Sequence, residues 1–135
     1  MKRYKYRLFI ALFFITIHTS YAQPVIGEWT DYQSYASAKN VVDTGDKVYC
    51  VTEGGLFSYN KTDNSIQKMS GINGLSDVGV QRLAYSKENN VLLIAYQNAN
   101  VDLLIGNTIY NLSDIKRKQL SADKTINNIM ISGKL

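Results

Sequence analysis

Short segments in which apolar and polar residues alternate are separated along this chain by turns rich in Gly, Asn and Asp. In the stretch 53–77, segments 56–59 and 65–69 alternate with period two, as expected of strands whose two faces have different surroundings. The polar residues 60–64 between them predict a hairpin turn. This stretch therefore predicts two antiparallel strands of one sheet.

Turn motifs bound this pair of strands: Gly54 and Gly55 come before it, and Gly74, Leu75, Ser76 and Asp77 come after it. At Gly54 and Gly55 we expect a tight turn, because positive φ costs glycine nothing. The second motif predicts the loop that leads into the next sheet, because an apolar segment starts a few residues later.

The same alternation predicts eight strands in two sets of four. The expected strands are residues 40–43, 47–52, 56–59 and 65–69 in the first set, and 80–85, 91–96, 100–105 and 108–112 in the second. The polar stretch 113–124 predicts a connection. Residues 128–135 echo 40–48, which predicts that a third unit begins there. Residues 25–30, with the single tryptophan, predict one further short strand.

This internal repeat indicates a β-propeller. The first strands of successive units, near Val41, Leu83 and Ile129, are spaced by 42 and 46 residues, close to the roughly 40 to 50 of a four-stranded blade. A β-sandwich with strands at regular spacing is the alternative. We therefore predict an all-β fold, a partial β-propeller of about two and a half four-stranded antiparallel blades. A propeller needs about four to eight blades to close, so the chain is expected to be the beginning of a longer protein, with residues 26–30 completing the last blade.

The charge of the chain lies almost entirely at its N-terminus. Of 135 residues, 45% are hydrophobic and 19% charged, which is typical of one modest globular domain. The net charge of +4 comes from Lys2, Arg3, Lys5 and Arg7, since the other eleven basic residues balance eleven acidic ones. A chain that is otherwise neutral is not expected to bind nucleic acid or a membrane surface through a basic field.

The first 22 residues have the pattern of a secretory signal peptide. A basic segment (1–7) precedes ten apolar or near-apolar residues (8–17) and small side chains at residues 20 and 22, which predicts cleavage between Ala22 and Gln23. The apolar run is half of the roughly 20 residues that span a bilayer, so no membrane span is expected after cleavage. Export removes His18, the only histidine. The domains are then 1–22, the signal peptide, and 23–135, the propeller part.

Few residues are candidates for chemistry, and each has a structural alternative that we favour. The single Cys50 is expected to be a buried, poorly reactive thiol beside the strand at residues 93–94. Asp102, inside an apolar strand, could bind a ligand, but a buried carboxylate more often accepts hydrogen bonds from a neighbouring turn. The run Lys116, Arg117 and Lys118 could meet a phosphate or an acidic glycan, or be a solvated loop. We predict no catalytic residue, metal site or cofactor.

Two motifs carry a resemblance to known repeats. Gly-Gly-Leu-Phe-Ser-Tyr at 54–59 and Asn-Gly-Leu-Ser-Asp at 73–77 resemble the repeat of two-component-regulator-type propellers. Taken with Ile-Gly-Glu-Trp at 26–29, Leu-Ile-Ala-Tyr at 93–96 and Asn-Val-Asp-Leu-Leu at 100–104, they resemble the N-terminal propellers of PorZ-type components of the type IX secretion system. The Trp-Ile-Gly-Thr strand typical of sensor ectodomains is absent, and Tyr-Cys-Val-Thr stands at 49–52.

The resemblance implies a non-enzymatic, exported scaffold or adapter at the cell surface or in the periplasm. Its partners would be other secretion and attachment proteins, with lipopolysaccharide bound, if at all, by parts outside these residues. One alternative is the ligand-sensing ectodomain of a hybrid two-component regulator, which a later transmembrane helix and kinase domain would signal. A propeller glycosidase or lyase is the third, and no pair of carboxylates can be placed for it.

Overall fold

The computed structural model describes residues 34–133. The expected signal peptide, its cleavage between Ala22 and Gln23, and the strand expected at 25–30 lie outside the described residues. Those expectations therefore stay predictions.

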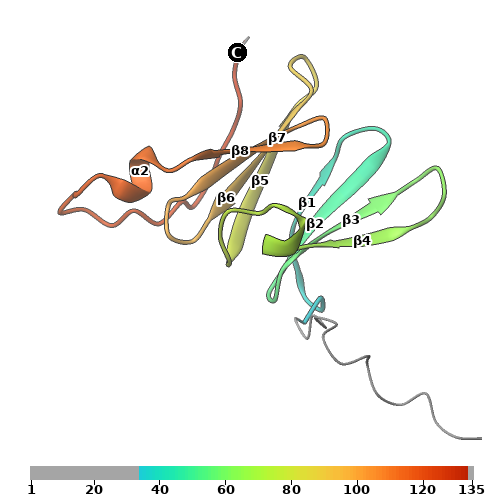
Figure 1. Cartoon of the computed structure of the whole chain (residues 1–135), viewed down its shortest axis with the longest axis horizontal. Coiled ribbons are helices and arrows are strands. Elements are labelled where there is room, and N and C mark those ends of the chain that lie inside the picture. Colours follow the sequence, from blue (N-terminus) through green and yellow to red (C-terminus); the bar gives the residue numbers. More distant parts are fainter. Residues whose placement is uncertain (1–33, 134–135) are drawn as a thin grey trace, which may run out of the picture. The chain divides into compact units, whose positions relative to one another are not determined.

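Eight strands form two four-stranded antiparallel sheets, each with its strands in chain order (Figure 1). Sheet A contains β1 (Ala38–Asp43), β2 (Lys47–Thr52), β3 (Leu56–Asn60) and β4 (Ile66–Met69). Sheet B contains β5 (Val80–Ser86), β6 (Val91–Tyr96), β7 (Val101–Ile105) and β8 (Thr108–Leu112). Four-stranded antiparallel sheets that repeat along the chain are the blades of a propeller, so the predicted fold class is confirmed for two blades.

The first strands of the two sheets share an irregularity at the same point. The register of β1 with β2 shifts between Ala38 and Asn40, and that of β5 with β6 shifts between Val80 and Arg82. An extra residue on one strand of a pair is a β-bulge, which bends the strand and increases its twist. Its recurrence indicates that the two sheets are copies of one structural unit.

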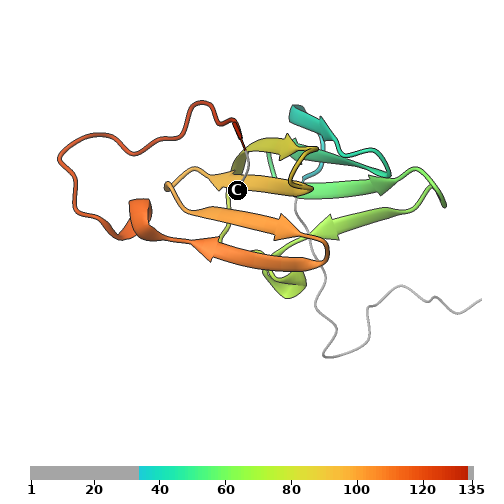
Figure 2. The same cartoon turned by 90° about the horizontal axis from the view of Figure 1, so that it is seen from above.

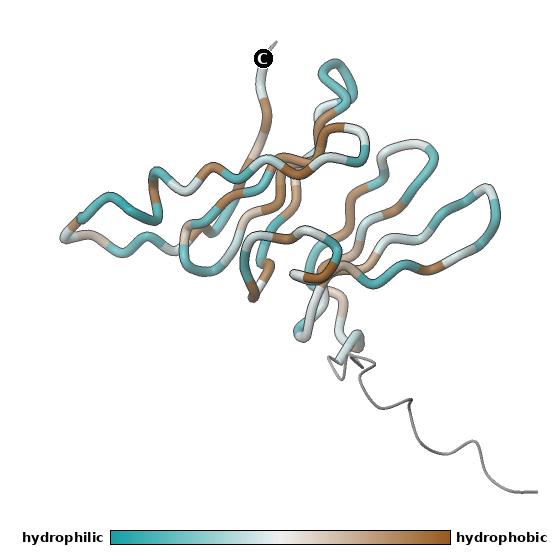
Figure 3. Tube along the Cα trace, in the orientation of Figure 1, coloured by the Kyte–Doolittle hydropathy of each residue, from teal (hydrophilic) through white to brown (hydrophobic). Residues whose placement is uncertain are grey.

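The two sheets meet through one apolar cluster. Its buried members are Tyr49, Val51, Leu56 and Met69 from sheet A, Val80, Leu83, Leu92, Ile94, Tyr96 and Leu104 from sheet B, and Leu75 in the loop between them. Strands β1 and β5, the first in their sheets, lie next to each other where the sheets meet (Figure 2). Figure 3 shows the hydrophobic segments in strands such as β6 and β7 and the hydrophilic ones in the turns. Removal of this apolar surface from water holds the blades together.

A side chain also joins the two first strands directly. Asn40 Oδ1 accepts a hydrogen bond of 2.7 Å from the backbone N–H of Leu83 in β5. Asn40 directly follows the bulge, where the register of β1 has shifted. The bulge therefore lies at the point where one blade contacts the next.

Residues 128–133 do not form the strand that their echo of 40–48 predicts. A strand needs a neighbour whose backbone takes its hydrogen bonds, and within the described residues side chains hold this segment instead. Arg82 Nε donates to the carbonyl oxygen of Asn127 at 2.8 Å, and Asn89 Nδ2 donates to that of Gly133 at 2.9 Å. The expected half blade is therefore absent from the described part, which contains two blades and a segment lying along sheet B.

The turn between β2 and β3 needs glycine for a reason other than the one expected. Neither Gly54 nor Gly55 has a positive φ. A Cβ built on Gly54 would lie 2.2 Å from the carbonyl oxygen of Ser34 and 2.5 Å from its nitrogen. Gly54 N–H also donates to that oxygen at 3.0 Å. The glycine is thus required because the backbone of Ser34 passes directly against the turn.

Gly54→Ala is expected to lower the free energy of unfolding by about 2 kcal/mol, because the new methyl group meets backbone atoms that cannot rotate away. Urea unfolding of the full-length protein measures the change. Gly71→Ala is the matched control, since nothing lies within 4 Å of a Cβ at Gly71 and its φ is not positive. Equal stabilities of the two variants would contradict the close approach.

Cys50 is a free, buried thiol, but not in the expected surroundings. Tyr49 and Val51 belong to the cluster with Ile94, so Cys50, between them on β2, points to the opposite face, away from sheet B. Its register partners are Val41 and Phe57. The expectation that the strand at residues 93–94 covers Cys50 is therefore wrong. Successive side chains of β2 point to opposite faces, so Tyr49 and Val51 face sheet B and Cys50 does not.

Labelling of Cys50 by a thiol reagent is expected to be slow in the folded full-length protein and fast in denaturant. Burial raises the pKa of the Cys50 thiol, and the thiolate is the reactive form. The rate of reaction with a chromogenic disulfide at pH 8, with and without urea, measures this. Equal rates in both conditions would contradict it.

Candidate functional site

The loop between the two sheets carries the predicted Gly-Leu-Ser-Asp motif. It begins with a 3₁₀ turn, η1 (Gly71–Asn73), in which the side-chain oxygen of Asn73 accepts a hydrogen bond of 3.2 Å from the N–H of Ser70. Gly74 follows with φ 98°, a left-handed conformation that favours glycine. Leu75 is buried in the apolar cluster. The turn and this leucine together fix the path of the loop.

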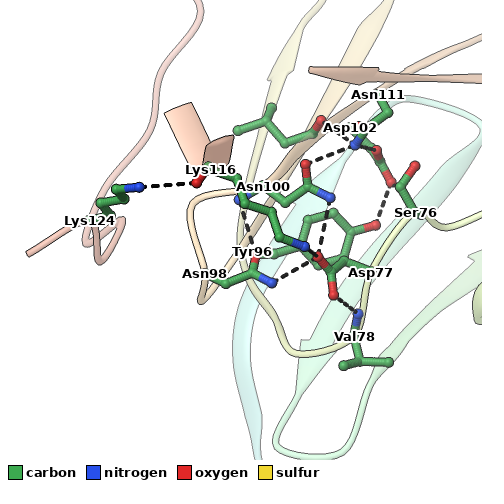
Figure 4. A network of polar contacts seen from close by, with 11 residues as sticks. Ser76, Asp77, Val78, Tyr96, Asn98, Asn100, Asp102, Asn111, Lys116 and Lys124 are labelled. Carbon is green, nitrogen blue, oxygen red and sulfur yellow. Dashed lines mark hydrogen bonds and ion pairs between the residues drawn. The ribbon is translucent and has the colours of Figure 1, made fainter. Parts of the chain in front are cut away.

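Asp102 holds the next residue of this loop. Its side chain, on β7, is fully buried. Its Oδ2 accepts hydrogen bonds from the backbone N–H of Ser76 at 2.9 Å and from the hydroxyl of Tyr96 (Figure 4). Its Oδ1 accepts one of 2.8 Å from Nδ2 of Asn111, its register partner on β8. The N–H of Ser76 is the donor from a neighbouring turn that the sequence predicts. Tyr96 and Asn111 supply two further donors to the same carboxylate.

Tyr96 completes this arrangement from β6. Burial, and then the neighbouring Asp102, raise the pKa of Tyr96. Its hydroxyl therefore stays protonated and serves as a hydrogen-bond donor. A buried carboxylate with three donors is satisfied, so Asp102 has no free oxygen directed at solvent.

Asp77 is the second carboxylate of the network and the last residue of the motif. Its Oδ2 accepts hydrogen bonds from Nδ2 of Asn98 at 2.8 Å and of Asn100 at 3.3 Å, and it forms an ion pair with Lys116 (Figure 4). Its Oδ1 accepts from the N–H of Val78 at 2.9 Å. Hydrogen bonds from Lys116 and then Asn98 lower the pKa of Asp77 to about 2. The loop is thereby tied both to the β6–β7 turn and to the segment after β8.

Lys116→Met is expected to lower the free energy of unfolding by about 1 kcal/mol or less at pH 7. The pKa of Asp77 falls from its ordinary 3.8 to about 2, so the pair's contribution is complete above pH 3.8 and is lost as the pH falls toward 2. Urea unfolding of wild type and variant should show a difference at pH 7 that shrinks at about pH 2.5. Arg117→Met is the control, and a pH-independent difference would contradict the pairing.

The basic run Lys116, Arg117 and Lys118 lies in and just after a short helix, α2 (Asp114–Arg117). Lys116 is paired with Asp77, and Lys124 Nζ donates to the carbonyl oxygens of Lys116, at 3.0 Å, and of Lys118. The run therefore does not present three free cations to an anion. Within the described residues its role is to connect the segment after β8 to the loop between the blades.

The sequence did not single out five residues of this network. Three of them have amide side chains, Asn98, Asn100 and Asn111, and the other two are Tyr96 and Lys124. A signal for the turn residues existed. Asn98 Oδ1 accepts from the N–H of Asn100 at 3.1 Å, and an Asn that bonds to backbone two residues on is typical of a turn. Their convergence on Asp77 joins residues more than twenty positions apart, which no local pattern indicates.

The network holds loops in place and offers no reactive group. Its two carboxylates are each bound by three or more donors within the protein. Among residues 34–133, no group of three or more His, Cys, Asp or Glu side chains could hold a metal ion. No helix in the same range is long and apolar enough to cross a membrane. Chemically, the arrangement is a rigid frame for the surface loops around it.

Comparisons with known proteins give one family and one structure. Residues 48–135 match the family model of the N-terminal β-propeller domain of PorZ, of the type IX secretion system. A solved structure of PorZ, described as an essential bacterial surface component of that system in the human oral bacterium Porphyromonas gingivalis, is 31% identical with a TM-score of 0.73. The similarity covers 79% of this chain but 15% of that one. No curated protein matches the chain significantly.

Proposed function

This chain belongs to the family of PorZ N-terminal β-propeller domains, and from that premise we propose that it acts as a non-enzymatic scaffold or adapter in type IX secretion. The observation that carries the proposal is the match of residues 48–135, together with 31% identity to a surface component of that system. The chain spans about one seventh of the length of that relative, so the role of the whole protein is part of the proposal.

The geometry of the polar network supports a scaffold. Catalytic carboxylates need a free oxygen within reach of a substrate, whereas Asp102 is buried under three donors and Asp77 is paired with Lys116. A frame of this kind fixes the loops at one end of the blades, and rigid loops are suited to hold a partner protein. We propose other secretion and attachment proteins as the partners, and an exported location at the cell surface or in the periplasm.

Deletion of the gene in its host tests the proposal. We expect cargo of the type IX system to be lost from the cell surface, measured by surface biotinylation and immunoblotting, with transcription of the cargo genes unchanged. The full-length protein carrying an epitope tag should also co-purify with other components of the system from envelope extracts.

Two results would overturn the proposal. Normal surface cargo after deletion would remove the role in secretion. If transcription of the cargo genes falls together with the amount of cargo at the surface, the protein would instead be a sensor, the second candidate from the sequence. Complementation with the unaltered gene is the control for effects on neighbouring genes.

A further inference from the structure

A second polar feature lies between the sheets, in a cavity that shares no lining residue with the network around Asp102. The cavity has a volume of about 320 Å³. Its floor comes from three register neighbours across sheet A, Tyr49 on β2, Ser58 on β3 and Gln67 on β4. The opposite wall comes from sheet B, with Leu104 and Ile109 as its apolar part beside Gly106 and Asn107 of the β7–β8 turn. We call it the Tyr49 cavity.

Two largely buried side chains, Tyr49 and Ser58, open their hydroxyls into this cavity. Tyr49 is 7% exposed and Ser58 is 4% exposed, yet neither hydroxyl has a hydrogen-bond partner among residues 34–133. Both hydroxyl oxygens remain accessible. Among residues 34–133, the one completely enclosed side-chain atom that lacks a hydrogen-bond partner is Gln81 Oε1. Burial, and then Tyr85, raise the pKa of Tyr49, so its hydroxyl is a donor. Both hydroxyls are therefore accessible from the cavity, where a ligand with an acceptor group can take hydrogen bonds from them.

The second blade shows that the fold itself does not require these hydroxyls. The shared bulge and the strand register make Leu93 and Leu103 the counterparts of Tyr49 and Ser58. Both counterparts are apolar and lie on the equivalent face of sheet B. The second blade thus forms the same sheet with leucines at these two positions. The hydroxyls of Tyr49 and Ser58 are therefore not needed to form a blade.

Charge indicates what kind of ligand fits. Lys47 is the only charged residue that lines the Tyr49 cavity, and it lies on the same face of β2 as Tyr49. Asp46 lines an adjoining cavity that also includes Lys47 and Tyr49, and Asp63 interacts electrostatically with Lys47, but neither acid lines the Tyr49 cavity itself. An ammonium group and two hydroxyl donors form a set that matches a carboxylate, because charge-assisted hydrogen bonds are stronger than neutral ones. The apolar wall suits a body with hydrocarbon surface.

We propose that the Tyr49 cavity binds a small organic monocarboxylate, with its carboxylate held by Lys47, Tyr49 and Ser58 and its body against Leu104 and Ile109. The volume is at the lower end for small-molecule pockets, which limits the ligand to about the size of a blocked amino acid or one acidic sugar. This site is independent of the adapter role, since nothing in that role uses it.

Calorimetric titration of the full-length protein tests the site with two matched pairs of probes. N-acetyl-leucine and glucuronate are expected to bind with Kd of about 1 mM or tighter. N-acetyl-leucinamide and glucose, which lack the carboxylate, should bind about tenfold more weakly or not at all. The acid that binds with the lower Kd identifies the source of the carboxylate. Tighter binding of N-acetyl-leucine indicates a peptide terminus, and tighter binding of glucuronate indicates an acidic sugar.

Three variants separate a binding role from a structural one. Lys47→Gln is expected to raise Kd about tenfold, and Tyr49→Phe and Ser58→Ala about threefold to tenfold each. Because neither hydroxyl has a partner among residues 34–133, Tyr49→Phe and Ser58→Ala should leave the melting temperature unchanged or raised. Tyr110→Phe, on the exposed strand β8 and outside the cavity, is the matched control and should change neither quantity.

The proposal is overturned by any of three results. The first is that neither acid binds at 10 mM, in which case water alone fills the cavity. The second is that the neutral probes bind as tightly as the acids, which would assign the cavity to an uncharged polar ligand. Finally, a fall in melting temperature for Tyr49→Phe with unchanged Kd would make the hydroxyl a structural group.

Discussion

Asp102→Ala is expected to lower the free energy of unfolding by about 3–5 kcal/mol, a large part of the roughly 5–15 kcal/mol that stabilises a domain. The substitution leaves three donors without their acceptor: the N–H of Ser76, the hydroxyl of Tyr96 and the amide of Asn111. Hydrogen bonds to a charged group contribute about 1.5–3 kcal/mol each, and their sum is not additive because the three share one carboxylate.

Urea unfolding of the full-length protein measures the loss, and hydrogen exchange locates it. The amide of Ser76 should exchange much faster in the variant, because its acceptor is gone. Asp102→Asn keeps the shape and one acceptor oxygen, so we expect about half the loss. Asp114→Ala, an exposed acid at the start of α2, is the control and should change stability by less than about 0.5 kcal/mol. Unchanged exchange at Ser76 would contradict the role of Asp102.

The strands could be predicted almost to the residue because their signals are local. Alternation with period two marks β3 and β4, and turns rich in Gly, Asn and Asp mark where strands end. The two short helices η1 and α2 were missed, because three or four residues carry no periodic pattern. The strand expected in residues 128–135 does not form in the described part, 128–133, for a related reason. Its residues alternate as a strand requires. A strand also needs a neighbouring strand for its backbone hydrogen bonds, and the local sequence does not show whether one is present.

The candidate site was predictable only in part. Asp102 stood out as a charge inside an apolar strand, and its need for donors follows from the cost of burying a carboxylate. Which donors meet it depends on contacts such as that with Ser76, 26 residues away, and the pairing of Asp77 with Lys116 spans 39. The requirement for Gly54 likewise comes from Ser34, twenty residues earlier. These are properties of the packed blades and not of any segment alone.

The second large effect concerns the outer face of sheet B, which is apolar in the described residues. Leu93, Val101 and Leu112 line a groove of about 600 Å³ there, together with Ile126, Ile129 and Met130 of the segment after α2. Leu112 is 45% exposed and Met130 78% exposed. On the far side of sheet A, Val41 is 55% exposed. In a propeller both faces of each blade pack against neighbouring blades.

A fragment of residues 23–135 expressed alone is therefore expected to associate and not to remain a stable monomer. Leaving about 200 Å² of apolar surface in water costs about 5 kcal/mol at about 25 cal/mol per Å², which is comparable to the stability of a whole domain. The unpaired edges of β4 and β8 add a route to aggregation. Size-exclusion chromatography with light scattering, followed by thermal unfolding, measures association and cooperativity.

Two comparisons make this expectation specific to the open face. The same residues within a protein that carries further blades should be monomeric and unfold at a higher temperature. In the fragment, Leu112→Lys places a charge on the exposed groove and should reduce association, whereas Ile72→Lys, in the exposed turn η1 outside both sheets, should reduce it less. A sharp, reversible unfolding transition from a monomeric fragment would show that two blades suffice by themselves.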